Sequence, residues 1–166
     1  PTMTRRATLQ DAPGIARVHV QTWKVAYDGI VPRAHLDGLS GEARTLRWRD
    51  NLSNPLGVTL VAESGGQVVG WLSYGKSRDE GADGVGEIYG IYVHPDSWNQ
   101  GFGRQLMQDA EQALWLEKYR SITLWVFELN ARSRRFYEHS GYSADGTRKT
   151  VSIGGQELVE LRYAKK

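Results

Sequence analysis

The chain of 166 residues contains no cysteine. It therefore has no disulfide bond, no thiolate metal site and no cysteine nucleophile. Histidine is also scarce, and no two of the four histidines have the spacing of a zinc-binding helix. We assign no metal to this sequence.

Long apolar runs and a dominant charge are missing as well. No apolar run approaches the roughly 20 residues that a membrane-spanning helix needs, and the first ten residues lack the apolar core of a signal peptide. The 21 lysines and arginines are interspersed with 19 acidic residues, for a net charge of +2, and form no basic stripe of the kind that binds nucleic acid. We expect a cytoplasmic protein that binds neither membranes nor nucleic acid.

The length and the 40% of apolar residues fit a single domain over residues 1–166. Strand-like runs alternate with segments of helical periodicity, and the pairs Gly65-Gly66 and Gly154-Gly155 predict hairpins. Strand–helix–strand units favour some parallel pairing, so we expect a mixed α/β sheet with helices on both faces. The predicted strands span residues 5–8, 58–64, 67–74, 86–93, 122–127, 142–153 and 156–164, and the predicted helices span 12–27, 32–39, 40–52, 101–118 and 130–139.

The most informative stretch is residues 87–104, which reads EIYGIYVHPDSWNQGFGR. A strand ends at a proline, and a loop then leads to Gly101 and Gly103 at the start of an amphipathic helix. The first N–H groups of a helix lack internal partners and lie at the positive end of its dipole, and glycine allows close approach. The pattern is typical of a phosphate site, although tight packing of helix on sheet would favour the same glycines.

Two better-known phosphate loops do not match this stretch. The dinucleotide fingerprint needs a third glycine where this chain has Leu106. The Walker loop needs Gly-Lys-Ser/Thr, but Gly103 is followed by Arg104 and Gln105. Dehydrogenases and P-loop NTPases are therefore disfavoured, and so is a related fold with another nucleotide ligand.

Two blocks of this sequence resemble the GNAT acetyltransferases. The family's central motif is Gln/Arg-x-x-Gly-x-Gly/Ala after a strand, and here the strand reads Ile91-Tyr92-Val93-His94-Pro95 and the loop reads Trp98-Asn99-Gln100-Gly101-Phe102-Gly103, with Trp98 in place of Gln or Arg. The second block, Asn130-x-x-Ser133-x-x-Phe136-Tyr137 followed by Gly141-Tyr142, is similar to the family's Asn-x-x-Ala-x-x-Phe-Tyr segment. Two blocks in the correct order are more specific than either alone.

The resemblance implies a fold, a cofactor and a coenzyme site. The fold would be a mixed, mostly antiparallel sheet of about seven strands, in which the strand at 87–93 splays from the strand at 122–127 to admit acetyl-CoA. The backbone of 91–93 would pair with the pantetheine arm, the amides of 100–104 would hold the pyrophosphate, and Asn130 would contact the pantetheine or phosphate region. The coenzyme residues implied are Ile91, Tyr92, Val93, Asn99, Gln100, Gly101, Phe102, Gly103, Arg104, Asn130, Ser133 and Tyr137.

The implied reaction is direct attack of an amine on the acetyl thioester. Tyr137 stands at the family's usual proton-donor position, and a phenol is protonated at neutral pH; packing at a helix end is the alternative. Glu87 is our candidate base, because strand alternation places Glu87, Tyr89, Ile91 and Val93 on one face. Glu128, water alone, or a purely surface role for Glu87 stay open.

An unpaired backbone amide near 91–93 would hold the oxyanion, and Gly90 could mark a bulge there or only close packing.

Trp23 and Tyr27 lie one helical turn apart in the region that covers the acceptor site in this family, and they are candidates for contacting the substrate. Both also fit a core stripe, and His19 fits a hydrogen-bonded core position better than a base. The sequence therefore predicts an acetyl-CoA-dependent N-acetyltransferase acting on a primary amine of a small molecule or peptide. A non-catalytic acyl-CoA-binding regulatory module is the alternative, and the C-terminal strands could pair across a homodimer.

Overall fold

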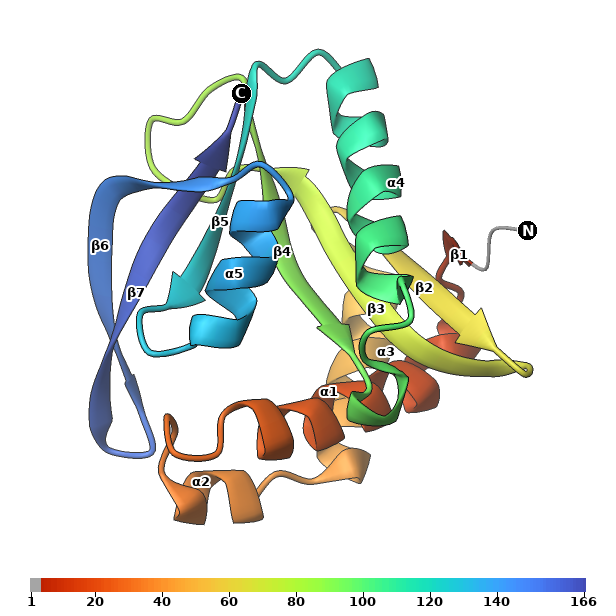
Figure 1. Cartoon of the computed structure of the whole chain (residues 1–166). Helices are drawn as coiled ribbons and strands as arrows, with labels where there is room; N and C mark the ends of the chain where they lie inside the picture. The colour runs from red at the N-terminus through yellow and green to blue at the C-terminus, as the bar shows by residue number, and fades with distance from the viewer. Residues whose placement is uncertain (1–3) are drawn as a thin grey trace.

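The computed structural model describes residues 4–166, which form one seven-stranded sheet with helices on both faces (Figure 1). The strands lie in the order β1-β2-β3-β4-β5-β7-β6, and every neighbouring pair is antiparallel except β4–β5. The predicted mixed, mostly antiparallel sheet is therefore confirmed. The strands are β1 (Thr4–Arg6), β2 (Val58–Ser64), β3 (Gln67–Lys76), β4 (Val85–Val93), β5 (Ser121–Phe127), β6 (Ser143–Ile153) and β7 (Gln156–Lys165).

The helices occupy the predicted places between these strands. Those described are α1 (Ala12–Ala26), α2 (Arg33–Asp37), α3 (Gly41–Ser53), α4 (Phe102–Leu116) and α5 (Ala131–His139), with short 3-10 helices η1 (Leu9–Asp11) and η2 (Pro95–Ser97). In Figure 1, α4 and α5 lie in front of the sheet, and α1 and α2 cross its lower end. Within residues 4–166, none of the helices has the length and apolar character to cross a bilayer.

Local sequence explains where several elements begin and turn. The Ser40 side chain accepts a hydrogen bond from the Ala43 N–H at 3.2 Å and so caps α3. Gly65 and Gly66 both have positive φ, 60° and 76°, as do the glycines of the β6–β7 turn. Two consecutive residues with positive φ match the twist of a tight hairpin, which is why both Gly-Gly pairs predict hairpins correctly.

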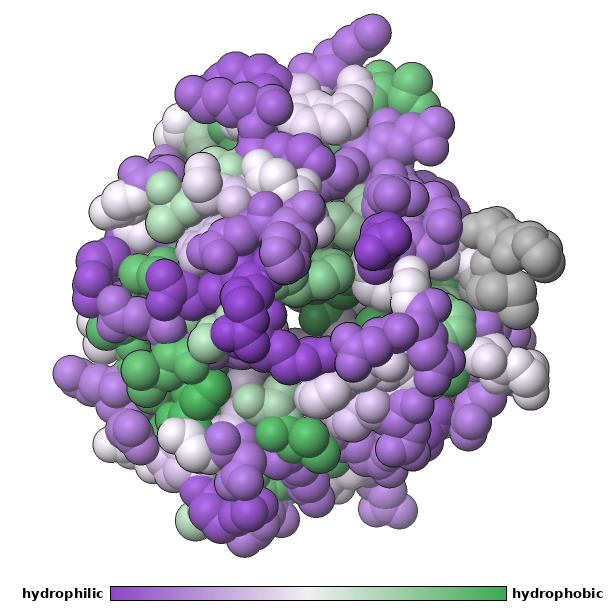
Figure 2. All heavy atoms as spheres, viewed as in Figure 1, coloured by the Kyte–Doolittle hydropathy of each residue, from purple (hydrophilic) through white to green (hydrophobic). Residues whose placement is uncertain are grey.

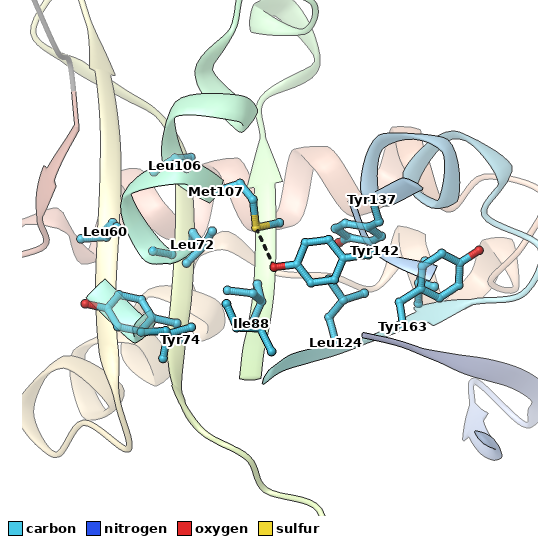
Figure 3. Packing of buried hydrophobic residues seen from close by; sticks show 14 of the residues in the cluster. Leu60, Leu72, Tyr74, Ile88, Leu106, Met107, Leu124, Tyr137, Tyr142 and Tyr163 are labelled. Carbon is cyan, nitrogen blue, oxygen red and sulfur yellow. Dashed lines mark hydrogen bonds between the residues drawn. The ribbon is translucent and has the colours of Figure 1, made fainter. Parts of the chain in front are cut away.

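The largest core lies between the sheet and α4. Leu106, Met107 and Leu114 are fully buried on the inner face of α4 and pack on strands β2 to β5. Figure 3 shows Met107 beside Tyr142, with the methionine sulfur 3.7 Å from the Tyr142 hydroxyl oxygen. α4 is thus fixed on the sheet, with its first turn held at the end of β4.

A second core lies on the opposite face, where α1 and α3 cover β2 and β3. Trp48 of α3 and Trp71 of β3 pack edge to face with ring centroids 4.7 Å apart. His19 of α1 lies beside both rings, and its Nδ1 accepts a hydrogen bond from the Trp48 indole at 3.3 Å. Burial, and after it the charges of Arg44 and Arg47, lower the pKa of His19 to about 3. The predicted core role of His19 is confirmed.

A third, smaller core joins the first helices to the far end of the sheet. Tyr27, Val31 and Leu36 pack against Phe127 of β5 and Leu158 of β7. This contact fixes the α1–α2 segment beside the ends of the central strands.

Candidate functional site

The two central strands, β4 and β5, separate partway along their length. They pair at only three positions, the last being Glu87 with Thr123. β4 continues to Val93 and β5 to Phe127, and Figure 1 shows the two strands diverging toward α1. The divergence leaves main-chain groups on the edge of β4 that a sheet would otherwise pair.

A cavity of about 920 Å³ opens at this divergence. Figure 2 shows a hollow near the middle of this face, with apolar atoms at its bottom and hydrophilic residues around it. Its walls come from α1, β4, the β4–α4 loop, α4, α5 and the end of β7. Every residue that the resemblance implies for coenzyme binding lines this cavity except Gln100, whose side chain donates to the Asp96 carbonyl at 3.4 Å.

The β4 wall presents its backbone to the cavity at alternate residues. The His94 N–H donates to the Val69 carbonyl of β3, so the main-chain groups of His94 point toward β3. Those of Ile91 and Val93 therefore point the other way, toward the open edge. The Val93 carbonyl accepts hydrogen bonds from the Trp98 indole at 2.7 Å and from the Thr22 hydroxyl at 3.3 Å. The Ile91 backbone remains as the edge group nearest the middle of the gap.

The N-terminus of α4 forms the next part of the wall. Gly101 is its N-cap and has a φ of 90°, a left-handed conformation that suits glycine. Asn99 also has a positive φ of 62°. Phe102, Gly103 and Arg104, which begin the helix, line the cavity, and the first N–H groups of a helix have no acceptor within it. An anion in the cavity would meet these donors and the positive end of the helix dipole.

α5 forms the opposite wall. The Asn130 side chain caps this helix by accepting from the Ser133 N–H at 3.1 Å, and both residues line the cavity. About one turn beyond Ser133, Phe136 and Tyr137 also line it.

Tyr137 differs from the tyrosines around it. Its side chain is 8% exposed, and burial, followed by the nearby Tyr92, raises its pKa well above that of an ordinary phenol. Of the tyrosines near it, Tyr142 donates to Glu111 at 2.7 Å, and Tyr163 donates to Glu138 at 2.9 Å. The Tyr137 hydroxyl has no hydrogen-bond partner within residues 4–166 and keeps its proton at neutral pH.

Glu87 does not line the cavity, and the prediction that it shares a face with Ile91 and Val93 is wrong. Ser73 of β3 pairs with Gly90 and Tyr74 pairs with Ile88, so Tyr89 is an extra residue without a β3 partner. Such a bulge reverses the alternation of side chains beyond it. The bulge at Tyr89 directly precedes Gly90, and a Cβ at Gly90 would lie 3.0 Å from the Trp71 ring, so both explanations left open for this glycine apply. The bulge is the reason that Glu87 faces away from α4.

The Glu87 carboxylate is almost completely buried, at 1% exposure. It accepts from the Arg78 N–H at 2.9 Å and pairs with the Arg78 guanidinium at 2.6 Å. Glu87 is nevertheless the last residue of β4 that pairs with β5. It therefore stands at the apex of the divergence, on the face of the sheet opposite α4.

The two aromatic residues predicted on the acceptor side have different positions. Tyr27 lines the cavity, and its hydroxyl lies 3.0 Å from that of Tyr92. Trp23 lies outside the lining and packs edge to face against Tyr27, with centroids 4.7 Å apart. Thr22 and Ala26 of the same helix line the cavity without having been predicted.

The charges around the cavity favour an anion. Arg104, Arg132 and Arg135 line it, and none of the three forms an ion pair within the described residues. Glu111, on the same surface, is already paired with Lys165 at 3.0 Å. The uncompensated charge is therefore positive.

Sequence reasoning missed Arg132 and Arg135, although helical periodicity could have found them. They lie three residues apart on α5, so they share one face of that helix, and Phe136 lies on the same face. Lys165, by contrast, reaches the cavity from β7 only because β7 inserts beside β5. No local pattern carries that information.

Comparisons with known proteins agree with this geometry. Residues 23–142 match the model of the Acetyltransferase (GNAT) family. The chain is 30% identical over 95% of its length, and 95% of the relative's, to the uncharacterized N-acetyltransferase YuaI of Bacillus subtilis.

Two solved structures share the fold over nearly the whole chain. One is a GCN5-related N-acetyltransferase from Rhodopseudomonas palustris, with a TM-score of 0.79, 25% identity, and coverage of 99% of this chain and 95% of that one. The other is the PaiA N-acetyltransferase of Thermoplasma acidophilum in complex with coenzyme A, with a TM-score of 0.78, 19% identity, and coverage of 100% and 99%. The chain therefore belongs to the GNAT acetyltransferase family and is an N-acetyltransferase.

Proposed function

We propose that this enzyme transfers the acetyl group of acetyl-CoA directly to a primary amine of a small molecule or peptide, with both substrates bound at once. The observation that carries the proposal is the divergence of β4 and β5 after Glu87, which opens a cavity between the N-terminus of α4 and α5. A long, thin ligand with an anionic segment fits an open strand edge that ends at a helix N-terminus.

The residues around the cavity fit each part of acetyl-CoA. The open edge of β4 at Ile91 offers main-chain partners to the amides of the pantetheine arm. The first amides of α4, over 100–104, offer donors to the pyrophosphate. The arginines without ion pairs supply positive charge that compensates the phosphates. Asn130 and Ser133 line the cavity on the α5 side, opposite the β4 edge and the first turn of α4. The coenzyme A complex of the Thermoplasma acidophilum protein with this fold supports the choice of ligand.

Acetyl-CoA supplies the activated acetyl thioester, and the chain supplies the proton transfers. Tyr137 lines the cavity, retains its proton because burial raises its pKa, and has no competing acceptor within residues 4–166. It can donate to the sulfur as the thiolate leaves. A backbone N–H on the open edge at Ile91–Val93 is placed to stabilise negative charge on the carbonyl oxygen.

Glu87 is the proposed proton acceptor, working from the other face of the sheet. Its position at the last β4–β5 pair puts the carboxylate beside the apex of the gap rather than inside the coenzyme cavity. A proton from the attacking amine would reach it through water. Arg78 holds the carboxylate in place.

The acceptor approaches from the side of α1. Tyr27 supplies an aromatic surface to the cavity there, and Trp23 supports Tyr27 from behind. An aromatic surface of this kind favours an organic amine.

The proposal is tested by adding acetyl-CoA and a panel of amines, amino acids and peptides, and following the release of free thiol. Coenzyme binding is measured separately by calorimetry. We expect tight acetyl-CoA binding, amine-dependent thiol release, and intersecting double-reciprocal lines when both substrates are varied. Parallel lines would indicate a covalent intermediate and contradict direct transfer, binding without release for any acceptor would favour a regulatory module, and a failure to bind any acyl-CoA would overturn the proposal.

A further inference from the structure

Trp98 and Arg132 form a contact across the cavity that the family pattern does not contain. Trp98 occupies the position at which the family's motif carries Gln or Arg. The Arg132 guanidinium lies over the Trp98 ring, with Cζ 3.5 Å from the centroid. Both residues line the cavity, one from the β4–α4 loop and one from the first turn of α5.

Trp98 is fixed on its other side. Its indole N–H donates to the Val93 carbonyl at 2.7 Å, which attaches the ring to the end of β4. A cation over the face of an anchored indole has fewer orientations than a free arginine side chain. The Trp98 ring therefore restrains the Arg132 guanidinium beside the loop that leads to Gly101.

The Arg132 charge lacks compensation. It has no ion pair within the described residues. Partial burial, and after it the positive charge of Arg135, lower the pKa of Arg132. An anion placed between this guanidinium and the first amides of α4 would relieve the repulsion and accept charge-assisted hydrogen bonds.

We propose that Arg132, held in place by Trp98, binds the pyrophosphate of acetyl-CoA and replaces the side chain that the family pattern carries at position 98. This inference rests on the proposed coenzyme site. The pyrophosphate is favoured over the 3′-phosphate because Trp98 precedes the N-terminus of α4 by only a few residues. Arg132 is the binding residue, and Trp98 is a positioning residue that acts through it.

Calorimetric titrations with acetyl-CoA test the roles of both residues. We expect Arg132→Gln to raise Kd about 10- to 100-fold, as for loss of a hydrogen bond to a charged group. The Kd of this variant should also depend less on salt concentration than that of the wild type, because one charge pair that salt screens has been removed. Trp98→Leu should raise Kd less, and it should add nothing in the Arg132→Gln background, because the ring acts only through the guanidinium. Arg49→Gln, on an exposed site of α3, is the matched loss of one positive charge and should leave Kd unchanged.

Rescue distinguishes positioning from a general structural effect. Trp98→Arg in the Arg132→Gln background restores a guanidinium at the position where the family has it, and should recover most of the lost affinity. Arg132 is largely exposed, so Arg132→Gln should melt within a few degrees of the wild type. Trp98 is half-buried, so the melting temperatures of the Trp98 variants are measured to show that these variants are folded.

Acetyl-3′-dephospho-CoA, which lacks the 3′-phosphate and keeps the pyrophosphate, tests which phosphate group of the coenzyme Arg132 binds. Arg132→Gln should weaken binding of this analogue by the same factor as acetyl-CoA. A loss seen only with acetyl-CoA would assign Arg132 to the 3′-phosphate and overturn the proposal. An unchanged Kd for Arg132→Gln, with tight wild-type binding, would overturn this inference and leave the proposed function intact; absence of wild-type binding would overturn both.

Discussion

At the scale of single residues, the environment of Tyr137 is the strongest argument for chemistry in the cavity. Buried tyrosines normally satisfy their hydroxyl with a partner, as Tyr142 does with Glu111 and Tyr163 does with Glu138. Tyr137 lines the cavity without such a partner among residues 4–166. A hydroxyl that stays protonated and has no hydrogen-bond partner can donate its proton once a substrate binds.

Replacing Tyr137 by phenylalanine tests this role. We expect kcat to fall at least about 100-fold, in the range of lost general acid catalysis, while the Kd of acetyl-CoA changes less than threefold because the ring remains. Single-turnover kinetics and calorimetry give the two quantities. An unchanged kcat would rule out Tyr137 as the donor.

Glu87 calls for a comparison of three variants, because its carboxylate also binds Arg78. Glu87→Gln should lower kcat/KM about 100-fold. Arg78→Gln removes the ion pair and keeps the carboxylate, so it should lower kcat/KM less than Glu87→Gln does. Glu128→Gln, the alternative base, should behave as the wild type; a loss of about 100-fold in this variant, with Glu87→Gln unaffected, would transfer the role to Glu128.

His19 predicts a pH dependence of stability. Its pKa is about 3 in the folded protein and about 6.5 in an unfolded chain. Between these values the unfolded state binds the extra proton, so the contribution of neutral His19 is fully present above pH 6.5 and is lost as pH falls toward 3. His19→Gln should reduce the pH slope of the unfolding free energy by about one proton between pH 6 and 4, measured by urea titration. Identical slopes in the two proteins would contradict this assignment.

At the scale of elements, the start of α4 depends on the backbone of Gly101. A Cβ at Gly101 would meet no atom within 4 Å, but its φ of 90° is unfavourable for other residues. Gly101→Ala should therefore destabilise the protein by about 1–2 kcal/mol and weaken acetyl-CoA binding as the loop shifts.

Gly103→Ala is the matched comparison for this loop. Gly103 lies within the helix, and its added Cβ would approach the Phe136 ring only to 3.4 Å. Stability should hold or rise by up to about 1 kcal/mol, while the close approach of the coenzyme is blocked. Thermal unfolding and calorimetry separate the effects; equal destabilisation by both variants would show that backbone strain is not what Gly101 avoids.

Local sequence patterns predicted the positions of the helices and strands well, but they did not predict which face of β4 each side chain occupies. Helical periodicity, the Ser40 cap and the two Gly-Gly turns placed α3, α4 and both hairpins within a few residues of their ends. The facing of Glu87 could not be predicted, because one unpaired residue at Tyr89 reverses every side chain of β4 beyond it. Glycine at position 90 was compatible with either a bulge or close packing, and only the pairing of β4 with β3 shows where the bulge lies.

The candidate site was predicted best where one segment supplies it. The segments 99–104 and 130–137 each supply several lining residues from one stretch of chain, and so their motifs could be recognised in the sequence. The contact of Trp98 with Arg132 joins the two segments, and only the folded chain brings them together. The same holds for Thr22, which reaches the Val93 carbonyl from α1.

At the scale of the whole molecule, the sheet is paired along its strands except where β4 and β5 separate. Strong pairing of β2 to β4 on one side and of β5 to β7 on the other holds the two halves rigid. The three pairs between β4 and β5 join the halves at one end only. α4 and α5 then line the gap from one face, and α1 closes its far end.

A crystal structure of the complex with acetyl-CoA is the most direct test of where the coenzyme binds. We expect the pantetheine arm along the open edge of β4 at Ile91, the pyrophosphate at the amides of 100–104 with Arg132 against it, and the thioester next to the Tyr137 hydroxyl. Coenzyme bound on another surface, with the gap between β4 and β5 closed or filled by side chains, would contradict it.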